Sequence, residues 1–246
     1  MDILKFSLKG KTAFFKKPEV NTYFSFTYGN IHKVALLGIF GAILGYGGYA
    51  SMNAKKDTYP EFFDRLKELR CSIVPKNENG FIKKKMQQFN NSVGYASAEQ
   101  GGNLIVKEQW LENPYWDVYV LIDCDEAKKL ADFMLERKCI YIPYLGKNDH
   151  PADILDVTLI EKCEPIESFI KIDSLFLKEK AVLGDIDDFE EEYCEVKEFK
   201  YEEYLPIGLN EDTNMYELKA FVHSNLPVKN YEDDIYRISD SVIAFF

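Results

Sequence analysis

The chain has 246 residues, 46% of them hydrophobic, and a formal net charge of −11. The hydrophobic fraction is high enough to bury a core, which excludes a disordered chain, and a uniformly acidic surface would argue against a nucleic-acid partner. The charge is unevenly spread, however. Residues 1–110 carry 16 Lys/Arg and 9 Asp/Glu, a net of +7, whereas residues 111–246 carry 14 and 32, a net of −18. The two halves are therefore expected to face different partners.

The reactive residue types exclude several classes of site. The 5 cysteines are odd in number and no two stand close together, so neither a disulfide framework nor a zinc site is expected. We predict reduced thiols in a cytoplasmic protein that has no resident metal or cofactor. The signatures of zinc proteases, P-loop proteins and α/β-hydrolases are absent, and the N-terminal residues lack the apolar run of a signal peptide.

The first 32 residues predict a strand followed by an irregular segment. Residues 2–9 alternate apolar and polar side chains, which indicates a half-buried strand. Residues 10–32 mix lysines with six aromatic residues and have no clear period. Lysines beside aromatic rings suit single-stranded nucleic acid, because cations follow the phosphates and rings stack on bases. The alternative is that the rings pack in the core and the lysines are merely solvated.

Residues 34–54 form a run of 21 residues without a charge, in which Gly41 and Gly45 make a GxxxG pattern. The run is long enough to span a bilayer, and small residues at this spacing allow two helices to approach closely. Its last third is polar, however, which leaves about 12 strongly apolar residues. A buried core helix is therefore the favoured interpretation, and a membrane helix is the alternative.

Further elements follow up to residue 103. Residues 59–69 predict an amphipathic helix, and residues 69–75 predict a strand that ends at Pro75. Residues 76–103 are polar, rich in Gly and Asn, and basic around Lys83–Lys85. Long irregular segments inside a domain are usually functional, so a protruding loop or hairpin is predicted here. A solvated lysine face is the alternative.

The remaining segments complete a recognisable order. Residues 104–109, 115–122 and 139–144 predict strands, Asp123 is a candidate cap for a helix over 125–138, and a turn-rich loop occupies 145–151. The order β–α–β–insert–β–α–β is that of an α+β, ferredoxin-like (split βαβ) fold. Residues 152–246 contain short strand-like runs and predict a smaller β-rich lobe. Its acidic run over 185–203 would repel phosphate.

Three segments carry a resemblance to a known family. They are YGNIHKVALLGIFGAILGYGGY (28–49), LIVKEQWLENPYWDVYVLID (104–123) and YIPYLGKNDHPADI (141–154). In this order they resemble the CRISPR-associated RAMP family, and within it the subunit that caps the 5′ end of the guide RNA in type I Cascade complexes. The type I-B branch is the most similar. The resemblance covers about residues 1–160 well and the acidic tail weakly.

The resemblance implies a fold, a function and partners. It implies a ferredoxin-like, RRM-like palm over 1–160, a thumb hairpin over 76–103 inserted into it, and an acidic β-rich lobe over 161–246. It also implies an antiviral role: binding of the 5′ handle of the crRNA, contacts with the Cascade backbone subunit and large subunit, and access to target DNA through the complex, with no membrane. The acidic lobe is expected to face a protein subunit.

The candidate RNA-binding residues lie in the basic half and in the loop over 145–151. Recognition of single-stranded RNA needs cations for phosphate, rings for stacking and amides for base edges. The candidates are Lys16, Lys17, Tyr28, Asn30, His32, Lys33, Lys83, Lys84, Lys85, Gln87, Tyr95, Gly146, Lys147, Asn148 and His150. Backbone amides near Gly146 are expected to hold a phosphate. His32 either lies near RNA or caps the glycine-rich helix.

A catalytic role is the first alternative. In the related type I-C branch the same subunit cleaves repeat RNA without metal, by means of a Tyr, a Lys and a His. His150 lies beside Lys147, and Tyr28 lies near His32, but the adjacent Lys–His pair of the nuclease branch is missing. We therefore predict a non-catalytic subunit. The second alternative is a protein-binding scaffold or membrane-associated adaptor built around the apolar run.

Overall fold

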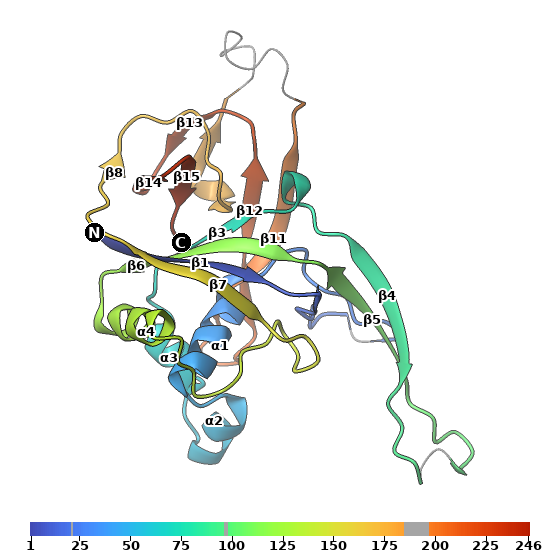
Figure 1. The fold of residues 1–246 in the computed structure, drawn as a ribbon. Coiled ribbons are helices and arrows are strands. Elements are labelled where there is room, and N and C mark those ends of the chain that lie inside the picture. Colours follow the sequence, from blue (N-terminus) through green and yellow to red (C-terminus); the bar gives the residue numbers. More distant parts are fainter. Residues whose placement is uncertain (21, 96–97, 185–196) are drawn as a thin grey trace.

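The computed structural model describes residues 1–246 except 21, 96–97 and 185–196 (Figure 1). Its central sheet has four strands in the order β3-β6-β1-β7, and every neighbouring pair is antiparallel. These strands are β1 (Asp2–Lys9), β3 (Cys71–Pro75), β6 (Tyr115–Ile122) and β7 (Asp153–Ile160). The order places β1 and β6 in the middle, where both of their faces are covered.

Helices cover one face of the central sheet (Figure 1). They are α1 (Lys33–Leu44), α3 (Glu61–Leu66) and α4 (Asp125–Leu135), whereas α2 (Tyr49–Lys55) lies farther from the sheet and has no buried residue. Helix α1 packs against α3 and α4, and its Phe40 ring lies edge-on to Phe6 of β1 at a centroid distance of 6.1 Å. Helices α1, α3 and α4, together with β1, β3 and β6, therefore enclose a large apolar core.

The glycine-rich helix is a core helix, as the favoured interpretation predicted. Nine of its twelve residues are buried. A Cβ atom on Gly41 would lie 2.4 Å from the Cβ of Phe62, so this glycine allows α3 to approach the helix backbone. Among the described residues no single helix is long and apolar enough to cross a bilayer. Only α1 and α2 taken together reach that length and composition, and they are bent by 78°.

The last strand of the central sheet differs from the prediction. Residues 139–144 do not form a strand; β7 over residues 153–160 pairs with β1 instead. The reason is that the backbone N–H groups of Ile140 and Tyr141 donate to the carbonyls of Ile43 and Ala42, at 3.0 Å each. The segment thus satisfies the C-terminal end of α1 and is not free to pair with a strand. The loop over 145–151 therefore precedes the last strand rather than following it.

Two further expectations near α4 were wrong. Asp123 does not cap this helix: the N-cap is Cys124, and Asp123 accepts a 2.7 Å hydrogen bond from Arg70. The helix ends at Leu135, three residues before the predicted end, and Arg137 follows with a left-handed φ of 55°. Of the residues predicted to form its apolar stripe, Ala127, Leu130, Ala131 and Met134 are buried, whereas Leu135 is 42% exposed. The position and most of the apolar face of α4 were thus predicted correctly, but its capping and its last stripe residue were not.

The described C-terminal residues form three small antiparallel sheets, ordered β11-β12-β9, β15-β14-β8 and β10-β13. The strands are β8 (Pro165–Ile166), β9 (Phe176–Leu177), β10 (Ala181–Leu183), β11 (Lys200–Leu209), β12 (Tyr216–Ser224), β13 (Val228–Tyr231), β14 (Ile235–Ile238) and β15 (Ser241–Ala244). Tyr236, Ile243 and Phe245 pack on the face of the central sheet opposite the helices. Strands β11 and β12 reach the helical side, where Leu205, with Phe221, joins the core around α1.

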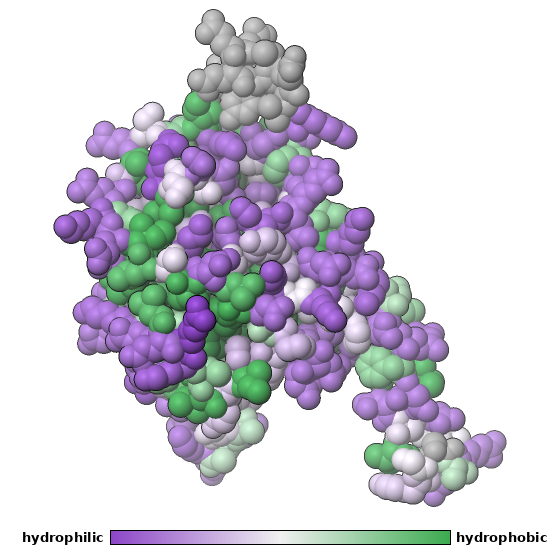
Figure 2. Space-filling model, in the orientation of Figure 1, coloured by the Kyte–Doolittle hydropathy of each residue, from purple (hydrophilic) through white to green (hydrophobic). Residues whose placement is uncertain are grey.

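Exposed apolar side chains also lie on the edge strand β7. Leu155 and Leu159 are 41% and 38% exposed. In Figure 2 apolar side chains gather over this part of the central sheet, between α4 and the C-terminal strands. The four described cysteines are free, but only Cys71 is buried, although most of the thiols were expected to be buried; Cys194 lies outside the described residues. Most of the acidic run over 185–203 also lies outside them; residues 197–203 are described.

Candidate nucleic-acid interface

A two-stranded hairpin projects from the central sheet where the insert was predicted (Figure 1). It consists of β4 (Lys84–Asn90) and β5 (Ile105–Glu112), and β2 (Thr12–Ala13) adds a third strand at its base. Strand β5 was predicted to belong to the palm, but it pairs with β4 and β2 and belongs to the hairpin. The hairpin is therefore longer than the predicted polar insert. The sequence of β5 was assigned to the palm because its apolar residues resemble those of a core strand.

Alternation along β4 separates its side chains onto two faces. Lys85, Gln87 and Phe89 are partly buried on one face, whereas Lys84, Met86 and the neighbouring even-numbered residues are exposed. Lys83 immediately before the strand is exposed as well. Tyr95, beyond the strand, is 82% exposed. Lys83, Lys84 and Tyr95 are thus open to a ligand.

The partly buried face of the hairpin packs against the loop over 145–151. The Nζ atom of Lys147 lies 3.0 Å from Oε1 of Glu108, and it lies 5.5 Å from the ring centroids of both Phe14 and Phe89. Lys85 lies 3.6 Å from Glu112 and 5.9 Å from the Trp110 ring. Cations and aromatic rings are therefore brought together here, but each of these two lysines already has a carboxylate partner.

His150 is enclosed at the same place. It is fully buried, its Nδ1 atom lies 2.6 Å from Oγ1 of Thr12, and its ring lies edge-on to Trp110 at 4.6 Å. Burial lowers the pKa of His150, so the ring is neutral near pH 7. As the structure stands, His150 does not reach the surface, whereas Asn148 in the same loop is exposed.

Gly146 is required by the packing of this loop. Its φ is 90°, and a Cβ atom would lie 1.9 Å from the carbonyl oxygen of Phe14. The loop is also held by its backbone, because Phe14 donates to Leu145 at 3.0 Å and Leu145 donates to His150 at 2.7 Å. The sequence assigned Gly146 to phosphate binding. The structure assigns it a close approach between two backbone segments.

The exposed face of the hairpin base lies near a second group of charges. The Nζ atom of Lys17 lies 2.8 Å from Oε1 of Glu203 and 4.9 Å from the Tyr28 ring centroid. The N–H of Gly29 donates to Oε2 of Glu203 at 2.8 Å. Desolvation lowers the pKa of Lys84; Glu203 opposes this shift and Lys17 adds to it. Lys84 therefore lies within electrostatic reach of both charges.

The residues around the start of α1 are internal. Asn30 is fully buried; its Oδ1 accepts from Nε1 of Trp116 at 2.9 Å and its Nδ2 donates to the carbonyl of Gly80 at 3.3 Å. Tyr28 and Lys33 are also buried, and burial raises the pKa of Tyr28 and lowers that of Lys33. The sequence placed these side chains at RNA. In the folded chain they contribute to the core.

His32 caps α1. Its Nδ1 accepts a 3.2 Å hydrogen bond from the backbone N–H of Ala35, and its ring packs edge-on against Tyr28 and Tyr216. Of the two roles that the sequence left open for His32, capping is the one present in the structure. Burial lowers the pKa of His32 to about 3, so the cap is a neutral imidazole.

Because His32 is buried, we expect the protein to become less stable as the pH is lowered. An unfolded histidine titrates near a pKa of about 6.5. Below that pH the unfolded chain takes up a proton that the folded chain takes up only near pH 3, so the free energy of unfolding decreases as pH falls through this window. Between pH 7 and pH 5 the loss is expected to be about 2 kcal/mol. His32→Asn retains a side chain that can cap the helix but does not titrate. In urea unfolding, its free energy of unfolding should decrease between pH 7 and pH 5 by about 2 kcal/mol less than that of the wild type; equal decreases in the two proteins would contradict the prediction.

A groove of about 1140 Å³ runs from the hairpin base along α1 to the turn before α2. Lys16 and Lys147 lie at the hairpin end, and small residues of α1 such as Gly38 and Ala42 line its floor. Its aromatic lining consists of Phe14, Phe15, His32, Tyr46, Tyr49, Phe62, Tyr141, Tyr144 and Tyr216. The groove thus places the exposed Lys16 and the partly buried Lys147, which is paired with Glu108, beside aromatic rings.

The exposure of residues 140–144, of which Tyr141, Ile142 and Tyr144 line the groove, was not predicted from the sequence. Ile140, Tyr141, Ile142 and Tyr144 are 58%, 59%, 80% and 46% exposed. A run of exposed apolar residues is unusual in a folded protein and indicates a surface that contacts a partner. The run was interpreted as a buried strand because short apolar segments do not distinguish the two cases.

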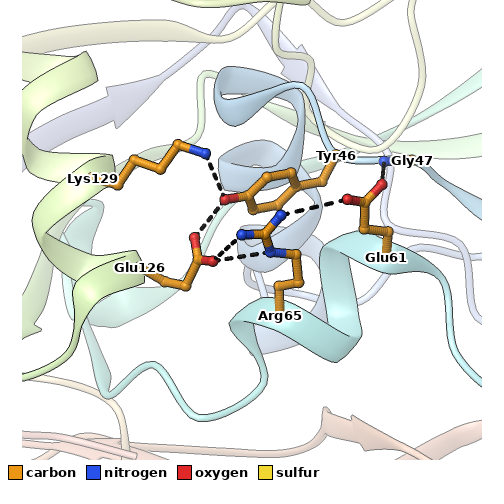
Figure 3. Close-up of polar contacts among 6 residues, drawn as sticks. All are labelled: Tyr46, Gly47, Glu61, Arg65, Glu126 and Lys129. Carbon is orange, nitrogen blue, oxygen red and sulfur yellow. Dashed lines mark hydrogen bonds and ion pairs between the residues drawn. The ribbon is translucent and has the colours of Figure 1, made fainter.

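A polar cluster fixes the far end of the groove (Figure 3). The hydroxyl of Tyr46 donates to Glu126 at 2.5 Å and accepts from Lys129 at 2.9 Å, and the Arg65 guanidinium lies over the Tyr46 ring, 4.2 Å from its centroid. Arg65 also donates to Glu126 at 2.6 Å, and Glu61 accepts from the backbone N–H of Gly47 at 2.9 Å. These contacts tie α3 and α4 to the turn after α1. Within the described ranges no group of three or more potential metal ligands is found.

Comparisons with known proteins address the fold. No protein-family model and no curated protein matches the sequence. A solved structure described as a CRISPR RNA-guided surveillance complex is similar, with a TM-score of 0.54 and 14% identity over 92% of this chain and 91% of that chain. A CRISPR protein from Archaeoglobus fulgidus is similar over 99% of this chain and 98% of that chain, with a TM-score of 0.50 and 12% identity. The chain is thus an α+β protein whose fold is similar to that of CRISPR-associated proteins.

Proposed function

We propose that this chain is a non-catalytic subunit of a type I-B Cascade complex, where it binds the 5′ handle of the crRNA. The proposal joins the resemblance of residues 1–160 to the RAMP family with the fold similarity to CRISPR-associated structures. The strand order β3-β6-β1-β7, with helices on one face, agrees with a ferredoxin-like palm. The hairpin of β4 and β5 projects from the position expected for the thumb of this family.

The base of the hairpin is the observation that supports RNA binding most strongly. Three segments far apart in the sequence meet there: residues 14–17, residues 83–89 and the loop over 145–151. Lys16 is exposed at the end of the groove that is lined with aromatic rings, and Lys83 and Lys84 are exposed on the hairpin outside that groove. Exposed cations beside aromatic surfaces are the combination that single-stranded nucleic acid needs. A binding site for the handle at this place accounts for the net charge of +7 over residues 1–110.

The positions of the histidines support a role without catalysis. Metal-free cleavage needs a base close to the 2′-hydroxyl and an acid close to the leaving oxygen. His32 and His150 are both buried, and burial lowers the pKa of each. His150 does not line the groove on which we place RNA, and His32, which does line it, is only 3% exposed.

The partners in the complex are proposed on chemical grounds. The exposed Leu155 and Leu159 of β7 suit the backbone and large subunits of Cascade, because protein interfaces contain such patches. The acidic C-terminal residues are proposed to face a protein subunit. A charge reversal at Glu190–Glu192 would test this, although these residues lie outside the described ones.

The function is tested by purifying the protein with its neighbouring Cascade subunits and sequencing the RNA that is retained. We expect crRNA whose 5′ handle is protected by this subunit, together with salt-dependent binding of handle RNA by the isolated protein. Incubation with full-length repeat RNA in the absence of metal should leave that RNA intact. Retention of no RNA would contradict the proposal in favour of a scaffold. Cleavage abolished by His150→Ala or His32→Ala would contradict it in favour of an endoribonuclease.

A further inference from the structure

Glu203 occupies a position in which three hydrogen-bond donors converge on one carboxylate. Its Oε1 atom accepts from Nζ of Lys17 and its Oε2 atom accepts from the N–H of Gly29, both at 2.8 Å, while the hydroxyl of Tyr201 also donates to Oε2. The donors come from two separate segments of the chain. A positive side chain, a backbone amide and a hydroxyl are the groups that bind a phosphate.

Gly29 is needed for this arrangement. A Cβ atom at this residue would lie 2.5 Å from the hydroxyl oxygen of Tyr201 and 3.0 Å from Oε2 of Glu203. The side chains of Lys17 and Glu203 are 28% and 14% exposed, so the pair lies at the surface and is only partly covered. Solvent and a ligand can therefore reach the cation, but the carboxylate is already beside it.

We propose that Glu203 is an internal competitor for RNA phosphate, and that it sets the affinity of the hairpin base for RNA by neutralising Lys17. The inference rests on the proposed RNA-binding function. A phosphate oxygen that approached Lys17 and the Gly29 amide would meet the carboxylate of Glu203 first. Glu203 of β11, in the acidic half of the chain, therefore reduces the positive charge that Lys17 of the basic half presents to RNA.

The matched control is the adjacent carboxylate. Glu202 points away from this site: its Oε1 lies 2.7 Å from Lys178 and its Oε2 lies 3.1 Å from Lys200. Glu203→Gln and Glu202→Gln remove the same charge from the same strand. Only Glu203→Gln removes the ion pair of Lys17. The side-chain amide oxygen that it leaves at position 203 can still accept the hydrogen bond from Gly29.

The experiment measures binding of single-stranded handle RNA to the folded full chain as a function of salt. Glu203→Gln is expected to bind about three- to tenfold more tightly, with a salt dependence steeper by about 0.7, the value for one additional phosphate contact on a single strand. Glu202→Gln should be close to wild type. In Lys17→Ala/Glu203→Gln the gain should disappear, because the released cation is missing.

The outcomes separate the two proposals. If wild type binds RNA but Glu203→Gln binds no more tightly than Glu202→Gln, the competitor role is wrong. If the gain persists without Lys17, it comes from the overall charge and the inference is also wrong. If wild type binds no RNA at any salt concentration, it is the proposed function that fails.

Discussion

Replacing Lys83, Lys84 and Lys85 together with alanine is expected to weaken binding of the handle RNA by about ten- to a hundredfold at a salt concentration of about 0.15 M. Lys83 and Lys84 are exposed at the base of the hairpin, where RNA is proposed to bind. Lys85 contributes less, because Glu112 lies 3.6 Å from its ammonium group. Since each contact with a single-strand phosphate adds about 0.7 to the salt dependence, the slope should fall by about 1 to 2.

A matched triple variant separates this local effect from a change in net charge. Lys55, Lys128 and Lys178 are exposed and lie on α2, on α4 and beside the C-terminal strands, away from the hairpin. Replacing these three with alanine removes the same charge and should change affinity less than threefold or so, with little change in slope. Equal losses in both triple variants would show that the hairpin base is not the binding surface, whereas an unchanged affinity in the first would remove these lysines from the site.

The second large effect is expected at Gly146. Gly146→Ala should reduce the free energy of unfolding by about 3 kcal/mol. The new Cβ atom would lie 1.9 Å from the carbonyl oxygen of Phe14, and that oxygen belongs to a backbone that cannot rotate away. The φ of 90° adds a conformational cost for any residue that has a side chain. Urea unfolding followed by far-UV circular dichroism measures the loss.

Gly48→Ala is the control for this prediction. No atom lies within 4 Å of a Cβ built on Gly48, and its φ of −96° suits any residue. We expect a change of less than about 1 kcal/mol, or a slight gain, because alanine restricts the unfolded chain. Since Gly146 also positions Lys147 between Phe14 and Phe89, Gly146→Ala should weaken RNA binding as well. A stability equal to wild type would mean that the loop can move away from Phe14 without cost.

Much of the fold followed from local sequence patterns. Alternation predicted β1, the amphipathic pattern predicted α4, and the polar, lysine-rich composition predicted a projecting element near residue 84. The last strand was misplaced because residues 139–144 are apolar enough for a strand, whereas their amide groups serve the end of α1. Strand β5 was misassigned because Leu111 joins the core of the palm, whereas the backbone of the strand pairs with β4 and β2 of the hairpin. Both errors concern partners that lie far away along the chain.

For the candidate site, too, some features followed from the sequence and others only from the tertiary structure. The sequence by itself determined that the first half of the chain carries a net positive charge and the second half a net negative charge, and that the glycine-rich apolar run suits a core helix. Only the tertiary structure decided which of these residues are available: Lys16, Lys83 and Lys84 are exposed, whereas Asn30, His32 and His150 are buried. It also placed Glu203 of the acidic half beside Lys17. The physical reason is that charge and hydrophobicity are properties of a residue, whereas burial and ion pairing depend on contacts between segments that the linear sequence does not specify.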